Sequence, residues 1–136
     1  MIINRRIMVR ESESIKQGNY MKTLEPKEVF SIFHEITRVP RPSKHEEQIR
    51  AWLINFAVSH NLEYQTDTIG NVVMRCPASP GYEQHNGVIL QAHMDMVCEK
   101  NSDTEHDFLS KGIDTYIDGD YVKARGTTLG GDDGIG

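Results

Sequence analysis

The sequence has 136 residues, of which 38% are hydrophobic and 26% charged, and its formal net charge is −5 at pH 7. This is enough chain for one domain with a core, and the composition is typical of a soluble globular protein. The acidic balance argues against nucleic-acid binding, which uses a basic surface. No apolar run approaches the ~20 residues that span a bilayer, and no signal peptide is present. The sequence therefore predicts a cytoplasmic protein without membrane association, whose Cys76 and Cys98 are reduced thiols.

The first half of the chain is predicted to contain helices. Residues 1–20 show no sustained periodicity and are expected to form a poorly ordered N-terminal extension. Residues 25–38 place apolar side chains on one helical face and end before a pair of prolines. Ser43, with Glu46 three residues later, predicts a capping box. The helix that follows is expected to run to about residue 60, because its apolar residues recur with helical spacing.

Short extended segments are predicted to follow the helices. Strands are expected over residues 62–66, 72–75, 88–92 and 121–124. The run of Val, Ile and Leu in residues 88–92 is typical of a buried strand. Residues 97–120 are acidic and irregular and are expected to form a solvated loop. A calcium-binding loop is discounted, because the carboxylates lack its spacing. The predicted order is thus two helices followed by four strands.

His93 and Asp95 lie where the predicted strand 88–92 ends. In an extended chain, residues two positions apart point to the same side. Open α/β sheets present their reactive groups just beyond the carboxyl ends of strands. An imidazole and a carboxylate at such a place form a plausible half of a metal site. The alternatives are a structural histidine and a helix N-cap for Asp95.

A glycine-rich stretch, residues 125–136, contains the adjacent carboxylates Asp132 and Asp133. A phosphate-binding loop is disfavoured, because the G-x-x-x-x-G-K-[ST] pattern is absent and the carboxylates would repel a phosphate. Glycines let the backbone approach other groups closely, so the stretch is better suited to a cation. It ends where a helix is expected to start, and we therefore expect the sequence to be a fragment of a longer protein.

Together, these motifs resemble a known enzyme family. The segments that carry the resemblance are Arg38–Glu47, Asp67-x-x-Gly70-Asn71, Leu90–Val97 and Lys123–Gly130. With them, residues 21–136 are similar to the M20 family of dinuclear-zinc peptidases, and most similar to its aminoacyl-histidine dipeptidase branch. The resemblance implies the N-terminal portion of an α/β zinc-peptidase catalytic domain, with a mixed sheet flanked by helices. The lid domain and the rest of the catalytic domain would lie outside the sequence.

The resemblance also implies roles for individual residues. His93 would be a zinc ligand, and Asp95 a catalytic residue that orients His93 and raises its basicity. Asp132 would be the carboxylate that bridges two zinc ions, and the Asp132–Asp133 peptide bond would be cis. Asp133 stands where relatives often carry Asn, which leaves its role open between a site residue and a carboxylate at a helix N-terminus.

The implied activity is that of a metal-dependent dipeptidase. It would hydrolyse Xaa-His and other dipeptides with a water activated between two zinc ions, and Co or Mn could occupy similar ligands. The catalytic base and the remaining ligands would lie beyond residue 136, so the isolated chain is expected to be inactive. A homodimer is the expected assembly of the full-length protein. The alternatives are a deacylase of the same fold and a non-catalytic, truncated remnant.

Overall fold

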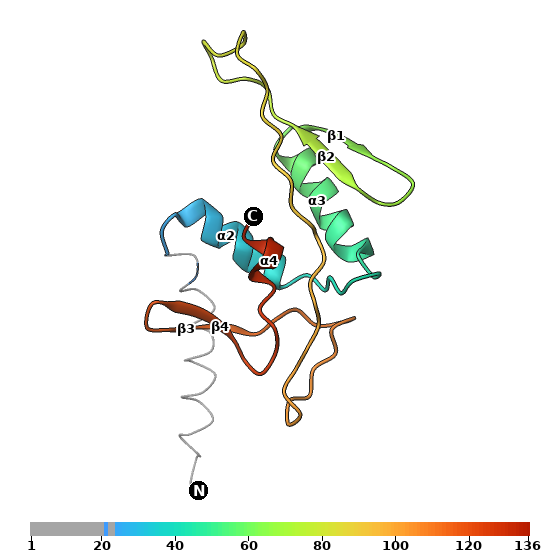
Figure 1. The fold of residues 1–136 in the computed structure, drawn as a ribbon, viewed down its shortest axis with the longest axis vertical. Helices are drawn as coiled ribbons and strands as arrows, with labels where there is room; N and C mark the ends of the chain where they lie inside the picture. Colours follow the sequence, from blue (N-terminus) through green and yellow to red (C-terminus); the bar gives the residue numbers. More distant parts are fainter. Residues whose placement is uncertain (1–20, 22–23) are drawn as a thin grey trace, which may run out of the picture.

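The structure is a computed structural model that describes residue 21 and residues 24–136, so the predicted N-terminal extension lies outside the described residues. Its elements in chain order are α2 (Lys27–Thr37), α3 (Glu47–Ser59), β1 (Glu63–Thr66), β2 (Val72–Arg75), β3 (Thr115–Asp118), β4 (Tyr121–Ala124) and α4 (Gly131–Gly134) (Figure 1). Helices and short antiparallel sheets occur together, which confirms the predicted α/β class. No described helix is long and apolar enough to cross a bilayer.

The two longer helices form where their periodicity predicted them. Helix α2 follows Pro26, whose ring fixes a φ suited to the start of a helix. It buries Phe33, while α3 buries Ile49 and Ala57, and these side chains are part of the small core of the described residues. Burying a large aliphatic or aromatic side chain stabilises the fold by about 1.5–3 kcal/mol. The buried apolar side chains come from these helices and also from the later loops, where Met96 and Ile113 are 3% and 8% exposed.

The predicted capping box at Ser43 and Glu46 is wrong. Glu46 itself is the N-cap of α3, and no side chain caps the helix. The Ser43 hydroxyl instead donates a hydrogen bond to Oδ2 of Asp95. An isolated parallel bridge between Pro42 and Met96 brings Ser43 next to that carboxylate. A charged acceptor makes a stronger hydrogen bond than a neutral one, so the hydroxyl turns towards Asp95 and away from the helix.

The first hairpin, β1–β2, matches its prediction closely. The strands pair antiparallel, with Glu63 opposite Arg75, and α3 contacts both of them. The turn between them is closed by Asp67, whose Oδ1 accepts hydrogen bonds from the N–H groups of Gly70 and Asn71 at 2.8 and 2.9 Å. A side-chain hydrogen bond from Asn71, followed by those from the backbone, lowers the pKa of Asp67. The Asp67-x-x-Gly70-Asn71 motif thus has a structural role in this turn.

The second hairpin, β3–β4, was only half predicted. Strand β4 has the predicted bounds, but β3 lies inside the segment 97–120 that was expected to be a loop. The acidic residues of this segment disfavoured a strand, and the sequence did not show that β4 would pair with it. Asp118 accepts a hydrogen bond from Lys123 at 2.6 Å, and Asp114 lies 3.3 Å from the Arg125 guanidinium. Opposite charges across the hairpin therefore offset the acidity that disfavoured a strand in the sequence.

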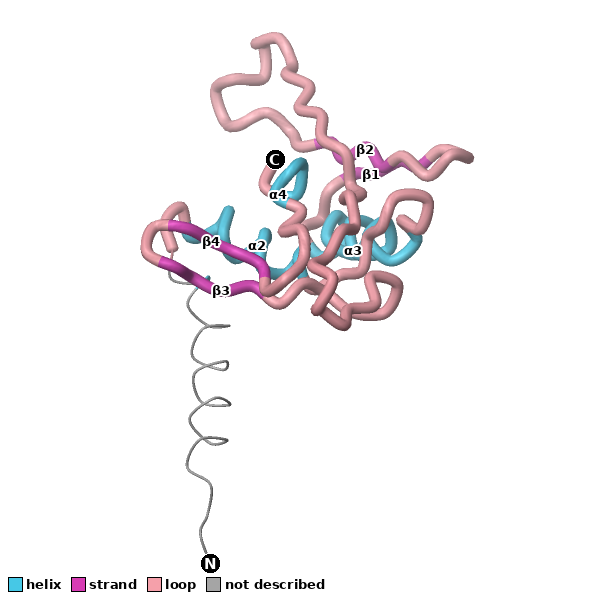
Figure 2. Tube along the Cα trace, turned by 60° about the horizontal axis from the view of Figure 1, so that its bottom comes forward, coloured by secondary structure: helices cyan, strands magenta, loops and turns pink. Residues whose placement is uncertain are grey.

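The predicted strand 88–92 is wrong as secondary structure. The whole connection between β2 and β3 is loop (Figure 2). Val88, Ile89 and Leu90 are 83%, 93% and 91% exposed. An extended segment becomes a strand only when neighbouring backbone satisfies its N–H and C=O groups, and no described strand pairs with it. The apolar pattern thus predicted a buried strand for which the described residues provide no pairing partner.

Candidate metal centre

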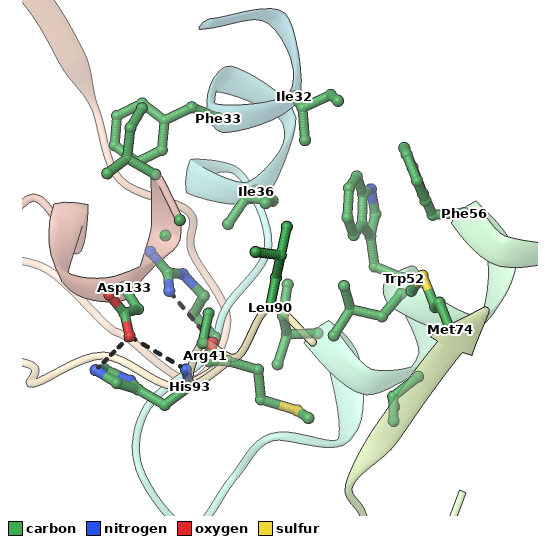
Figure 3. Close-up of a pocket in the computed structure, with 18 of the residues that line it drawn as sticks. Ile32, Phe33, Ile36, Arg41, Trp52, Phe56, Met74, Leu90, His93 and Asp133 are labelled. Atoms are coloured by element: carbon green, nitrogen blue, oxygen red, sulfur yellow. Dashed lines mark hydrogen bonds and ion pairs between the residues drawn. The ribbon is translucent and has the colours of Figure 1, made fainter. Parts of the chain in front are cut away.

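Two segments far apart in the sequence meet at one cluster of potential metal ligands. His93 comes from the extended connection, and Asp132 and Asp133 come from α4. One ligand atom from each of the three side chains lies within 4.8 Å of the others. His93 Nε2 is 3.1 Å from Oδ1 of Asp132 and 3.9 Å from Oδ2 of Asp133. In Figure 3 the Asp133 carboxylate faces the His93 ring.

Asp95 holds the other side of the imidazole. Its Oδ1 lies 2.9 Å from His93 Nδ1, and its Oδ2 accepts the hydrogen bond from Ser43. The Ser43 hydrogen bond, and then the one with His93, lower the pKa of Asp95, which keeps its carboxylate ionised. An ionised carboxylate can only accept, so Nδ1 carries the proton in this contact. The tautomer that remains after loss of the second proton leaves the Nε2 lone pair facing Asp132 and Asp133.

The carboxylates around His93 favour its protonated form. The hydrogen bond with Asp132, and then those with Asp95, raise the pKa of His93 above its ordinary value. The proton on Nε2 sits between the imidazole and Asp132, where it offsets the negative charge of the cluster. A divalent cation at the same place would satisfy the same donors. The site is therefore arranged for a positive charge.

The donor set fits a zinc ion. Zinc binds imidazole nitrogen and carboxylate oxygen at about 2.0–2.2 Å, which separates two ligands of a tetrahedral ion by about 3.4 Å. The distances from His93 Nε2 to Asp132 and to Asp133, 3.1 and 3.9 Å, lie on either side of that value. The Asp132 side chain is 93% exposed, so its second oxygen is accessible to a further ion.

The loop that carries the two aspartates is shaped by glycine. Gly130 has φ 71° and ψ 31°, a left-handed conformation that L side chains rarely adopt. Asp132 then has non-helical angles inside α4, which turn it away from a regular helical path. The Asp132–Asp133 peptide bond is cis, as the family resemblance implied. The glycine-rich composition of residues 125–136 thus reflects a tight loop that presents two carboxylates to His93.

Comparison with known proteins identifies relatives of this arrangement. The chain is 47% identical over 116 residues to cytosol non-specific dipeptidase of Escherichia coli (strain K12). The crystal structure of aminoacylhistidine dipeptidase from Vibrio alginolyticus is 46% identical and superposes with a TM-score of 0.82. The chain is homologous to these dipeptidases. Each match covers 85% of the chain but only 24% of the relative. No family model matches the chain.

In this homologue of dipeptidases, most of the site residues predicted from the sequence lie close together. His93 and Asp132 converge, Asp95 lies behind His93, and Asp133, whose role was open, belongs to the cluster. His45 is exposed and lies outside this cluster of the described residues. Sequence reasoning did not assign Arg41 and Ser43 to the site. The available signal was their position in the Arg38–Glu47 segment that carried the family resemblance.

Zinc binding by the dipeptidase homologue is expected to depend on pH through His93. A metal must displace the Nε2 proton, so affinity should fall about tenfold per pH unit below the pKa of His93. Because that pKa is raised, the decline should begin above the ordinary value of 6.5. Zinc affinity measured by chelator competition from pH 5.5 to 8.5 checks this. In Asp132→Asn, NMR titration of the metal-free protein should show a lower His93 pKa. An unchanged pKa would contradict the assigned cause.

Proposed function

We propose that the chain is part of a zinc-dependent dipeptidase of the M20 family and provides one corner of its two-metal site. The observation that carries the proposal is the convergence of His93, Asp95 and Asp132 in a chain 47% identical to a dipeptidase. The chain covers about a quarter of the length of that relative. The substrate class is an Xaa-His or other dipeptide, because the relatives are an aminoacylhistidine dipeptidase and a non-specific dipeptidase.

Each residue has a distinct role in this proposal. His93 would hold a metal through Nε2, while Asp95 retains the proton on Nδ1, orients the ring and raises its basicity. Asp132 would serve as a carboxylate ligand shared by the two metals, and Asp133 supports the cluster with its negative charge. Two zinc ions, when bound, supply an acidified water and polarise the substrate carbonyl. Co or Mn would accept the same nitrogen and oxygen donors.

The reaction also needs a general base that accepts a proton from the attacking water. The described cluster contains one histidine and two aspartates but no glutamate. In the family, a Glu-Glu pair downstream of the bridging aspartate supplies the base and a further ligand. We therefore propose that residues 1–136 alone do not turn over dipeptides. We also propose that the complete enzyme is cytoplasmic and assembles as a homodimer.

An activity assay tests the proposal. The 136-residue chain and the longest open reading frame that contains it would be purified free of host proteases and incubated with zinc. The substrates are an Xaa-His dipeptide and an N-acyl amino acid. We expect hydrolysis of the dipeptide by the product of the longer frame and none by the 136-residue chain. His93→Ala in the longer protein controls for contaminating peptidases and should abolish the activity.

Three outcomes would overturn the proposal. Turnover by the 136-residue chain would show that the chain contains its own base. Preference of the longer protein for the N-acyl amino acid would support a deacylase of the same fold. A stop codon soon after Gly136 would support a non-catalytic remnant.

A further inference from the structure

Arg41 is a buried cation beside the candidate metal centre. It is only 2% exposed, and its guanidinium contacts both segments that carry the ligands. Nη1 donates hydrogen bonds to the carbonyl oxygens of Met94 and Asp95 at 3.2 and 3.4 Å, and Nη2 donates to the carbonyl of Gly130. Its own backbone carbonyl accepts the N–H of Met96 at 2.9 Å. Arg41 therefore joins the His93 segment to the Asp132 loop.

The loop is fitted closely around the guanidinium. A Cβ atom added to Gly130 or Gly134 would collide with the guanidinium nitrogens of Arg41. The backbone on either side of Asp132 and Asp133 thus lies directly against this planar group, as Figure 3 shows for Asp133 and Arg41. The planar guanidinium can donate hydrogen bonds to carbonyls of two segments at once. The ammonium of a lysine, in contrast, is a point donor on a flexible stem.

We propose that Arg41 is a positioning residue that locks the Asp132 loop to the His93 segment and so preorganises the metal ligands. The inference rests on the proposed metal site but not on the identity of the substrate. Arg41 itself contacts no ligand atom in the cluster of His93, Asp132 and Asp133. It acts through the backbone of residues 94–95 and 130. Ser43, two residues after Arg41, adds to this effect because its hydroxyl donates a hydrogen bond to the Asp95 carboxylate that orients His93.

Because Arg41 is positively charged, an electrostatic role and a positioning role predict opposite changes in zinc affinity when Arg41 is neutralised. A buried positive charge repels a nearby cation, so a purely electrostatic role would make zinc bind more tightly when Arg41 is neutralised. A positioning role predicts the opposite, because the ligands would lose their fixed separation. Groups that orient metal ligands typically contribute about 10–100-fold to metal affinity. Arg41→Gln should therefore weaken zinc binding by about that factor, and Arg41→Lys should weaken it although the charge is retained.

The experiment uses the 136-residue chain and measures zinc affinity by competition with a chromophoric chelator. Arg75→Gln is the matched control, because Arg75 is an exposed arginine that pairs with Glu63 across the β1–β2 hairpin and contacts none of the candidate ligands. Cobalt is then bound at saturation, and its visible absorption spectrum reports the ligand geometry of the folded fraction. We expect weaker zinc binding and an altered cobalt spectrum for both Arg41 variants, and neither change for Arg75→Gln.

Folding is monitored in the same samples by circular dichroism and thermal unfolding. If a variant is largely unfolded, Arg41→Ala with millimolar guanidinium provides the second test, and partial recovery of zinc affinity is expected. Wild-type zinc affinity in Arg41→Lys or Arg41→Gln, or tighter binding in Arg41→Gln, would overturn the proposal. So would lower stability with an unchanged cobalt spectrum, which would indicate a purely structural role. None of these outcomes depends on dipeptidase activity.

Discussion

Replacing His93 with alanine is expected to abolish specific zinc binding by the chain. His93 is the one nitrogen donor in the cluster with Asp132 and Asp133 among the described residues, and its Nε2 faces both carboxylates. The two aspartates left behind would be exposed oxygen ligands without an oriented partner. We expect zinc affinity to fall by at least about 100-fold, which exceeds the effect of removing a group that only orients a ligand. Chelator competition or isothermal titration calorimetry would measure it.

The matched control is His85→Ala. His85 lies in the loop between β2 and β3, with its ring tilted against that of Tyr82 at a centroid distance of 5.1 Å, and lies outside the cluster. The His85→Ala variant also lacks one imidazole, and it therefore corrects for adventitious zinc binding to exposed imidazoles. Zinc affinity of the control should equal that of the wild type. Equal losses in the two variants would show that zinc binds nonspecifically, and the assignment of His93 as a ligand would then be wrong.

The second large effect is expected for Gly130→Ala. The added Cβ would collide with the Arg41 guanidinium and come within 2.8 Å of Met96 Sδ, in a residue whose φ is +71°. The loop must then move away from the His93 segment, and the two aspartates move with it. We expect zinc affinity to fall by about the 10–100-fold that follows the loss of groups that orient metal ligands. The left-handed conformation should also cost about 1–2 kcal/mol of stability.

Gly119→Ala separates these contributions. Gly119 has φ +59°, but a Cβ there would meet nothing within 4 Å. Its alanine variant therefore carries the backbone strain without the collision and should lose stability while keeping wild-type zinc affinity. Thermal unfolding and chelator competition on both variants make the comparison. Equal zinc affinity in Gly130→Ala and Gly119→Ala would contradict a role for close packing of this loop against Arg41.

The parts of the fold that the sequence predicts well depend on local interactions. Helices α2 and α3 and the β1–β2 hairpin follow from apolar periodicity and turn residues that are close together in the chain. The site is predictable to the extent that His93 and Asp95 share one side of an extended segment. The pairing of His93 with Asp132 came from the family resemblance, because spacing alone does not show that the glycine-rich loop returns to this segment.

The features that the sequence did not predict depend on distant partners. Arg41 donates to carbonyls that lie 53, 54 and 89 residues away, and backbone carbonyls leave no signature in a sequence. Ser43 has the spacing of a helix cap, but a carboxylate 52 residues away takes its hydrogen bond. Strand β3 needed β4 beside it. In each case the local sequence pattern was also compatible with a purely local role, and a contact with a distant residue determined the observed structure.

The exposed connection through Val88, Ile89 and Leu90 has a consequence for handling the protein. An apolar, extended segment with unpaired backbone groups is a template to which another chain can add a strand. Concentrated solutions of the 136-residue chain should therefore be prone to self-association through β-addition. A charged residue in place of Ile89, which is 93% exposed, would be a rational solubilising change.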